Sequence, residues 1–183
     1  MSWIRSADGI ATPEAPSRSD PGADMTALFR ALALDPSGAQ SIAEHARTLA
    51  AEPTPLPLAQ AELIGVVVSA TNGCGYCVAH YGPRLARALG DEPLARAVAR
   101  DYREANLAAR DRVLLDYAVA LTCEPSERKE DDVERIREYG FDDAAILRAT
   151  HLAAYVGLLN RLASGLGVAL EPNVQAWEFG DQR

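Results

Sequence analysis

The stretch AELIGVVVSATNGCGYCVAHYG, residues 61–82, places two cysteines three positions apart, shortly after a β-branched apolar run. Propensity alone favours a buried strand for that run, residues 63–70. The sequence offers no convincing partner strand, and a lone strand cannot satisfy its backbone hydrogen bonds inside a core. We therefore expect residues 63–70 to form a buried helix, and this choice decides the fold class.

Most of the remaining sequence repeats its apolar residues with the period of an α-helix. Ser37 and Asp91 are candidate helix caps, and Gly140 is a candidate helix end. The expected further helices cover residues 25–34, 39–50, 92–102, 109–123, 132–140 and 142–165. In the last of these, one stripe is expected to contain Ile146, Leu147, His151, Ala154, Tyr155, Leu158 and Leu162. The sequence thus predicts an all-α protein.

The overall composition fits one domain without a nucleic-acid or membrane partner. A chain of 183 residues, 48% of them hydrophobic, can bury one substantial core. Its net charge of -8 would repel phosphates and anionic membrane surfaces. The N-terminus lacks the apolar core of a signal peptide, so a cytoplasmic location is expected. The expected organisation is an irregular arm (1–22), a domain (23–171) and a tail (172–183).

The cysteine pair has the spacing of a redox centre. A helix that begins near Gly73 would place Cys74 in its first turn and both cysteines on one face. The positive end of the helix would stabilise a thiolate. A thiolate can attack a peroxide O–O bond to give a sulfenic acid, which a second thiol converts to a disulfide. A nearby base is also needed to accept the thiol proton.

Other interpretations of the same residues remain open at this point. A Cys-x-x-Cys can be half of a zinc site, but Cys123 and His151 are isolated in the sequence, so no metal or cofactor is expected. Cys123 is expected to be a small buried apolar residue. Taken alone, His80 could be an ordinary core or surface histidine, and Glu62 a favourable first-turn carboxylate. The dithiol could also belong to a non-catalytic redox sensor or binding protein.

Together these residues form a more specific pattern. Glu62, eleven intervening residues, Cys74, two more residues and Cys77 closely resemble the signature of the alkylhydroperoxidase AhpD-like, carboxymuconolactone decarboxylase family. Over residues 25–170 the chain is similar to its uncharacterised peroxidase-related branch. The resemblance implies an all-α fold of helical hairpins, a homo-oligomer, a hydroperoxide substrate and a thiol or dithiol reductant. It also implies that Cys77 is peroxidatic, that Cys74 resolves it and that Glu62 begins a proton relay.

One position departs from the family signature. The family's histidine position is occupied by Tyr81, and His80 comes one residue earlier. At about 100° per residue, His80 lies roughly 60° from Cys77 around a helix, so it is expected to reach the sulfur from the side. Tyr81 is a poor base at neutral pH but can donate a hydrogen bond to a thiolate or a peroxide oxygen. His80 and Tyr81 are therefore both candidate catalytic residues.

Overall fold

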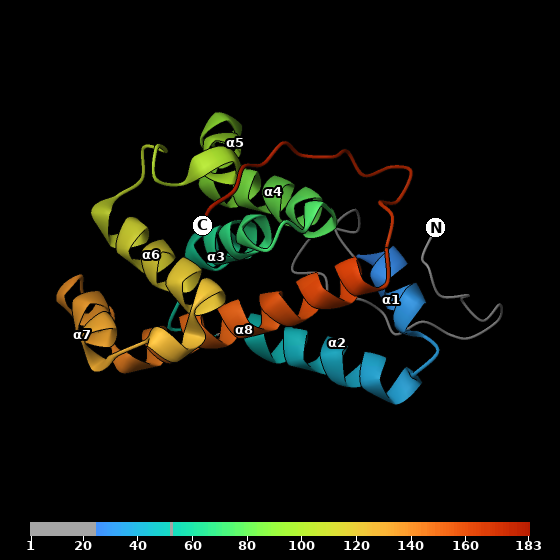
Figure 1. Cartoon of the computed structure of the whole chain (residues 1–183), viewed down its shortest axis with the longest axis horizontal. Coiled ribbons are helices and arrows are strands. Elements are labelled where there is room, and N and C mark those ends of the chain that lie inside the picture. Colours follow the sequence, from blue (N-terminus) through green and yellow to red (C-terminus); the bar gives the residue numbers. More distant parts are fainter. Residues whose placement is uncertain (1–24, 52) are drawn as a thin grey trace.

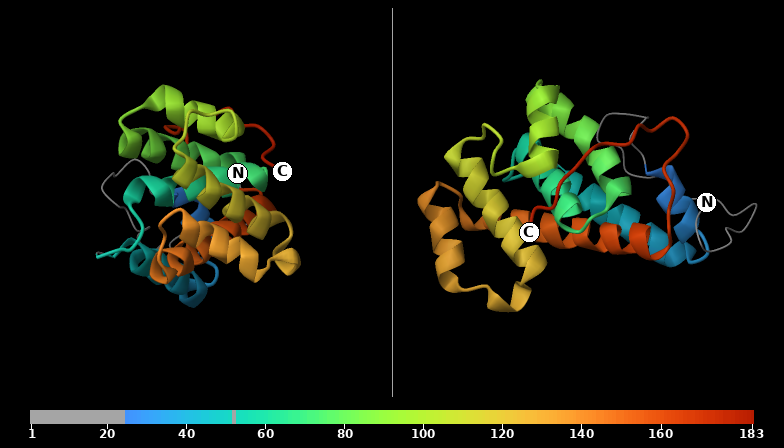
Figure 2. Two further views of the ribbon diagram at one scale, coloured as in Figure 1. Left: turned by 90° about the vertical axis from the view of Figure 1, so that its left-hand side faces the viewer. Right: turned by 45° about the horizontal axis from the view of Figure 1, so that its top comes forward.

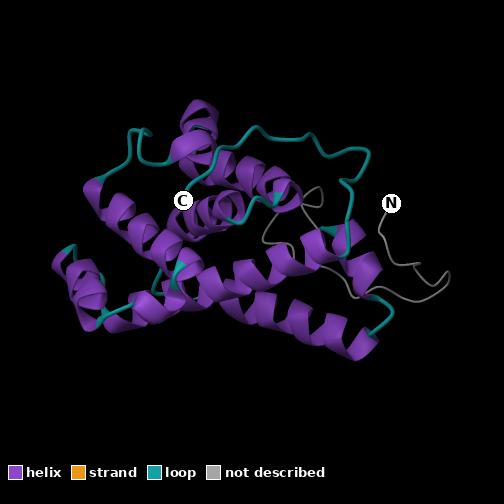
Figure 3. Ribbon diagram, viewed as in Figure 1, coloured by secondary structure: helices purple, strands orange, loops and turns teal. Residues whose placement is uncertain are grey.

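The computed structural model describes residues 25–51 and 53–183, and this part of the chain is helical without any strand (Figures 1 and 3). The α-helices are α1 (Thr26–Leu32), α2 (Pro36–Ala50), α3 (Leu58–Thr71), α4 (Gly75–Leu89), α5 (Glu92–Asp101), α6 (Ala109–Cys123), α7 (Glu130–Glu138) and α8 (Asp143–Gly165), and a 3₁₀ turn, η1 (Pro125–Glu127), follows α6. The expected all-α fold is confirmed. The expected arm of residues 1–22 lies outside the described residues. Within those ranges, no helix is long and apolar enough to cross a membrane.

Helix α3 lies at the centre of the fold, where it contacts α4, α5, α6 and α8. Every residue from 62 to 71 is buried, so this helix has no polar face. A helix that is apolar all round is expected where neighbours cover every side. The buried helix expected over residues 63–70 is thereby confirmed.

Several helix ends differ from the expectations, and the largest differences are at the starts of α2 and α3, which begin three and five residues earlier than expected, at Pro36 and Leu58. The cap of α2 is Asp35, whose carboxylate accepts the Gly38 N–H, and not Ser37, whose hydroxyl donates to Asp35. Asp91 caps α5 as expected. Cys74 is the N-cap of α4 rather than a residue of its first turn. Its sulfur therefore lies directly at the end where the backbone N–H groups are exposed.

The stripe expected along α8 is wrong in part. Leu147 is 69% exposed and Leu158 39% exposed, and His151 is also exposed. The buried positions of this helix include Ala145, Ala149, Ala153, Val156, Gly157, Asn160 and Ala163. Small side chains on this face allow α8 to lie close against α3 and α6, a packing reason that a search for large apolar residues overlooks.

After α8, the chain returns as an irregular tail, residues 166–183, which passes over α4 and ends near α5 (Figures 1 and 2). Trp177 is 7% exposed and packs against Gly82 of α4, and the Arg96 guanidinium lies 4.3 Å from its ring centroid. Phe179 reaches Gly75, next to the cysteine pair. The tail is therefore part of the packed structure.

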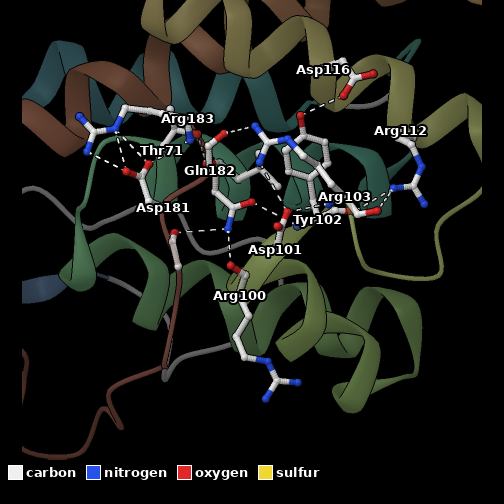
Figure 4. Close-up of polar contacts among 12 residues, drawn as sticks. Thr71, Arg100, Asp101, Tyr102, Arg103, Arg112, Asp116, Asp181, Gln182 and Arg183 are labelled. Carbon is white, nitrogen blue, oxygen red and sulfur yellow. Dashed lines mark hydrogen bonds and ion pairs between the residues drawn. The ribbon is translucent and has the colours of Figure 1, made fainter.

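The penultimate residue fixes the end of this tail. Gln182 is fully buried, and its amide nitrogen donates to the carbonyls of Ala99 and Arg100 at 3.0 Å each (Figure 4). Its amide oxygen accepts the Tyr102 N–H at 3.1 Å. One side chain thus binds two carbonyls and one N–H group at the C-terminal end of α5, where the last carbonyls of a helix lack intrahelical partners.

The contact between α4 and the tail leads to a stability prediction. A Cβ atom added at Gly82 would lie 2.4 Å from Trp177 Cε3, so Gly82→Ala should push the indole outward. We expect a loss of about 1–3 kcal/mol of unfolding free energy, measured by urea denaturation. The matched control is Gly165→Ala, whose Cβ would meet nothing within 4 Å. Equal stability of the two variants would contradict a tightly packed tail.

Candidate active site

The two cysteines meet at the start of α4. Their sulfur atoms lie 2.7 Å apart, and the Cys77 N–H donates to Cys74 Sγ at 3.4 Å. Both are free thiols, and both are buried, with Cys74 2% and Cys77 0% exposed. Because the first turn of the helix holds the sulfurs in contact, a disulfide can form with little movement of the backbone.

The contact between the two sulfurs gives the two thiols different pKa values. A hydrogen bond from Cys77 lowers the pKa of Cys74 to about 7, although burial opposes this change. The Cys77 N–H and the side chains of Ser164 and Asn160 lower it further. The pKa of Cys77 is raised well above its ordinary value, because its thiol donates to Cys74 and because it is buried. The thiolate of the reduced pair therefore resides on Cys74.

The lowered pKa of Cys74 predicts the result of a pH titration. The ultraviolet absorbance of the thiolate should rise with a midpoint near pH 7, and Cys77→Ala should move the midpoint upward by removing the main hydrogen bond. An unfolded Cys74 would bind more protons than the folded one between pH 7 and its ordinary pKa of 9.0. Stability should therefore rise with pH across that window. A midpoint near pH 9 in the wild type would contradict this assignment.

A buried amide network supports the sulfurs from α3 and α8. Asn160 is 2% exposed, its amide nitrogen donates to Ser69 Oγ at 3.0 Å, and its oxygen accepts from Asn72 Nδ2 at 2.9 Å. Hydrogen bonding from Asn160 favours the ionised form of both cysteines. Sequence reasoning placed Asn160 on the last helix but gave it no role. The sequence feature that points to such a role is a polar residue on a helix face that is otherwise apolar and buried.

Glu62 and Tyr81 lie in a second cluster with Arg84. The Arg84 Nη2 donates to Glu62 Oε1 at 2.7 Å, and the guanidinium lies 5.1 Å from the Tyr81 ring centroid. Glu62 Oε2 is buried and has no hydrogen-bond partner among the described residues. Gly65 makes room for Tyr81, since a Cβ there would lie 2.4 Å from the ring. The family's carboxylate is thus held by a cation that sequence reasoning missed.

The Tyr81 hydroxyl connects this cluster with the cysteines. Burial is the main cause that raises the pKa of Tyr81 far above its ordinary value. The charge of Arg84 opposes this shift, whereas Glu62 and Cys77 increase it. Tyr81 therefore stays protonated at neutral pH. It is a hydrogen-bond donor within the electrostatic reach of Cys77 and not a base.

His80 lies in a different cluster. Its Nε2 lies 3.0 Å from Glu171 Oε2, and the Tyr76 hydroxyl donates to Glu171 Oε1 at 2.9 Å. Burial would raise the pKa of Glu171, but hydrogen bonds from the Ala27 N–H and Tyr76 and the nearby His80 outweigh it, so the pKa is lowered. In the structure, Glu62 is hydrogen-bonded to Arg84 and His80 to Glu171.

Two remaining sequence expectations are also corrected or decided. Cys123 is exposed at the end of α6, because the last turn of that helix projects from the core, and the expectation of a buried residue is wrong. His151 contacts His45 on the surface and does not face the cysteines. Of the predicted site residues, the structure brings Cys74, Cys77, Tyr81 and Glu62 toward one region and ties His80 to the tail.

Comparison with known proteins supports the family resemblance. The family model described as the carboxymuconolactone decarboxylase family matches residues 36–109, which include the glutamate and both cysteines of the signature. The chain is therefore similar to this family over the region that carries the signature. No curated protein matches the sequence.

Solved structures of other proteins agree with the fold. An uncharacterized peroxidase-related protein from Ralstonia eutropha JMP134, described as an alkylhydroperoxidase AhpD core, is 26% identical with a TM-score of 0.76, covering 91% of this chain and 95% of that one. A peroxidase-related protein from Silicibacter sp. TM1040 is 26% identical with a TM-score of 0.75, covering 93% and 97%. The debrominase Bmp8, 16% identical with a TM-score of 0.69 over 92% and 95%, shares the fold. The AhpD-like helical fold is confirmed.

Proposed function

We propose that this protein reduces hydroperoxides with the Cys74–Cys77 pair, in keeping with the peroxidase-related names of its relatives. The observation that carries the proposal is the contact of the two sulfurs at 2.7 Å, where one thiol stabilises the thiolate of the other. A thiolate near neutral pH is the nucleophile that attack on an O–O bond requires. A second thiol in contact is what converts the product into a disulfide.

The proposed reaction has three steps. A thiolate of the pair attacks the terminal oxygen of R–O–O–H, the O–O bond breaks, and the R–O⁻ group takes up a proton and leaves as an alcohol. The resulting sulfenic acid condenses with the second thiol, giving the disulfide and water. An external thiol or dithiol then reduces the disulfide and is itself oxidised. The resemblance assigns the attack to Cys77, whereas the lower pKa places the thiolate of the reduced pair on Cys74. For Cys77 to attack, its proton would first pass to Cys74 across the 2.7 Å contact.

Tyr81 is the proposed proton donor to the leaving oxygen. It occupies the family's histidine position, remains protonated and lies within the electrostatic influence of Cys77, Glu62 and Arg84. A hydrogen bond from its hydroxyl would stabilise negative charge as the O–O bond breaks. Glu62 would accept and return the proton through its carboxylate, and Arg84 would hold that carboxylate in place. His80, held by Glu171, would position α4 and the tail.

A multiple-turnover assay tests this function. Purified protein is mixed with hydrogen peroxide, tert-butyl hydroperoxide or cumene hydroperoxide and a small dithiol, and peroxide loss is followed over many equivalents. Sustained turnover is expected. A single equivalent consumed, with the disulfide formed and no turnover under any reductant, would favour the redox sensor. The homo-oligomer, the physiological reductant and the cytoplasmic location stay predictions.

A structural zinc module has less support than either redox function. Such sites use four ligands. In residues 25–51 and 53–183, no three His, Cys, Asp or Glu side chains are grouped so that they could hold a metal ion together. The cysteine pair therefore lacks the further ligands that the zinc interpretation requires.

A further inference from the structure

Two of the three histidines in the sequence meet on the surface, away from the cysteine pair. His45 lies on α2 and His151 on α8, 106 positions later, and their Nε2 atoms are 2.7 Å apart. The ring centroids are 4.6 Å apart, with the ring planes inclined by 57°. These side chains join two helices that lie side by side along the molecule (Figures 1 and 2).

The contact presents two metal-binding nitrogens to one point. A hydrogen bond between two neutral imidazoles places one Nε2–H against the lone pair of the other Nε2. If the donor ring takes its other tautomer, with the proton on Nδ1, both Nε2 lone pairs become available. Neutral imidazole is the form that binds transition metals.

The surroundings hold the pair in place and leave one side open. The Tyr155 ring packs against His45 at 4.8 Å, and its hydroxyl donates to the Ile42 carbonyl at 3.0 Å. His151 is exposed to solvent, so that an ion can enter and water can complete its coordination. The nearest cation along α8 is Arg148, whose guanidinium donates to the Thr48 and Leu49 carbonyls at the end of α2. On α2, Glu44 accepts from Gln40.

We propose that His45 and His151 form a two-histidine site for a divalent transition-metal ion, which bridges α2 and α8. Two imidazoles at about 2.0–2.1 Å from one tetrahedral ion have nitrogens roughly 3.3 Å apart. The Nε2 atoms, now 2.7 Å apart, therefore need to separate by about 0.6 Å. With only two protein ligands the site is exchangeable, and Cu²⁺ should bind more tightly than Ni²⁺ or Zn²⁺.

This site is independent of the proposed peroxidase. Asn160, the α8 residue that supports the cysteines, lies nine positions beyond His151, a rise of roughly 14 Å along the helix. An ion at His151 therefore does not coordinate the sulfurs. Because the ion binds two helices of the native state, it should also raise the midpoint of thermal unfolding.

Titration with Cu²⁺ tests the site. The full chain without an affinity tag, with Cys74, Cys77 and Cys123 changed to serine so that thiols neither bind nor reduce the ion, is titrated by calorimetry and electron paramagnetic resonance. We expect one ion per chain and a spectrum typical of imidazole nitrogen ligands. His45→Gln and His151→Gln should each weaken Cu²⁺ binding by roughly 10²-fold or more, because the one imidazole that remains then has to bind the ion alone.

The matched control is Arg148→Gln, which removes the neighbouring charge and keeps both imidazoles. It should bind Cu²⁺ as tightly as the parent or more tightly, with circular dichroism confirming that every variant is folded. Undiminished affinity in either histidine variant, or no saturable binding by the parent, would overturn the proposal. A rise of the unfolding midpoint with Ni²⁺ in the parent, and its absence in both histidine variants, would support the bridge between the helices.

Discussion

Replacing Cys77 with serine is expected to abolish multiple-turnover reduction of hydroperoxides, down to the rate of the uncatalysed reaction. The resemblance assigns the attack on peroxide to this sulfur, and serine is a far weaker nucleophile near neutral pH. Cys74→Ser protein should instead react once and stop at the sulfenic acid, because its resolving thiol is missing. Peroxide consumption and mass spectrometry after trapping with a sulfenic-acid reagent distinguish the two variants.

The opposite pattern would transfer the attack to Cys74. That outcome has a physical basis, since Cys74 has the lower pKa and is the N-cap of α4. Retention of full turnover by both variants would contradict the redox function altogether. Cys123→Ser is the matched control, and it should keep wild-type turnover because Cys123 is exposed at the end of α6.

The fold could be predicted where local pattern and global packing agree. The β-branched run in α3 was assigned to a helix because a lone strand would leave its backbone unsatisfied, and the structure confirms it. The face of α8 was predicted less well, because Ala149 and Ala153 allow close helix packing while Leu147 is exposed. The buried role of Gln182 could not be read from the sequence, since its partners lie about 80 positions earlier.

The candidate site, like the fold, could be predicted from the sequence only in part. The spacing of Cys74 and Cys77 predicted their contact, because a first helical turn places positions three apart side by side. Arg84 follows Tyr81 by three positions on α4, so helix spacing could have indicated it as a neighbour. Glu171, 91 positions after His80, depends on the path of the tail and gives no comparable signal. Local spacing thus predicted the contact between the two cysteines, whereas the partners of Glu62 and His80 depend on tertiary contacts.

Arg84→Met is expected to destabilise the protein by about 3 kcal/mol, the scale observed when one partner of a buried ion pair is removed. Glu62 is 3% exposed, and Arg84 is its hydrogen-bond partner at 2.7 Å. Without the guanidinium, a buried carboxylate would have to remain ionised without compensation or take up a proton. Urea unfolding measures the loss. Arg100→Met, which removes an exposed arginine from α5, is the matched control and should change stability by less than about 0.5 kcal/mol.

The double variant Glu62→Gln/Arg84→Met separates the structural role of this pair from its chemical role. Removing both charges should restore most of the lost stability, since a buried ion pair can often be replaced by neutral side chains at little cost. The turnover of the double variant should nevertheless remain roughly 10²-fold below that of the wild type if the Glu62 carboxylate transfers protons to and from the cysteine pair. A double variant as unstable as Arg84→Met would show that the arginine stabilises through contacts such as its stacking on Tyr81. A stable double variant with full turnover would give Glu62 and Arg84 a structural role only and leave Tyr81 as the polar group that assists the sulfurs.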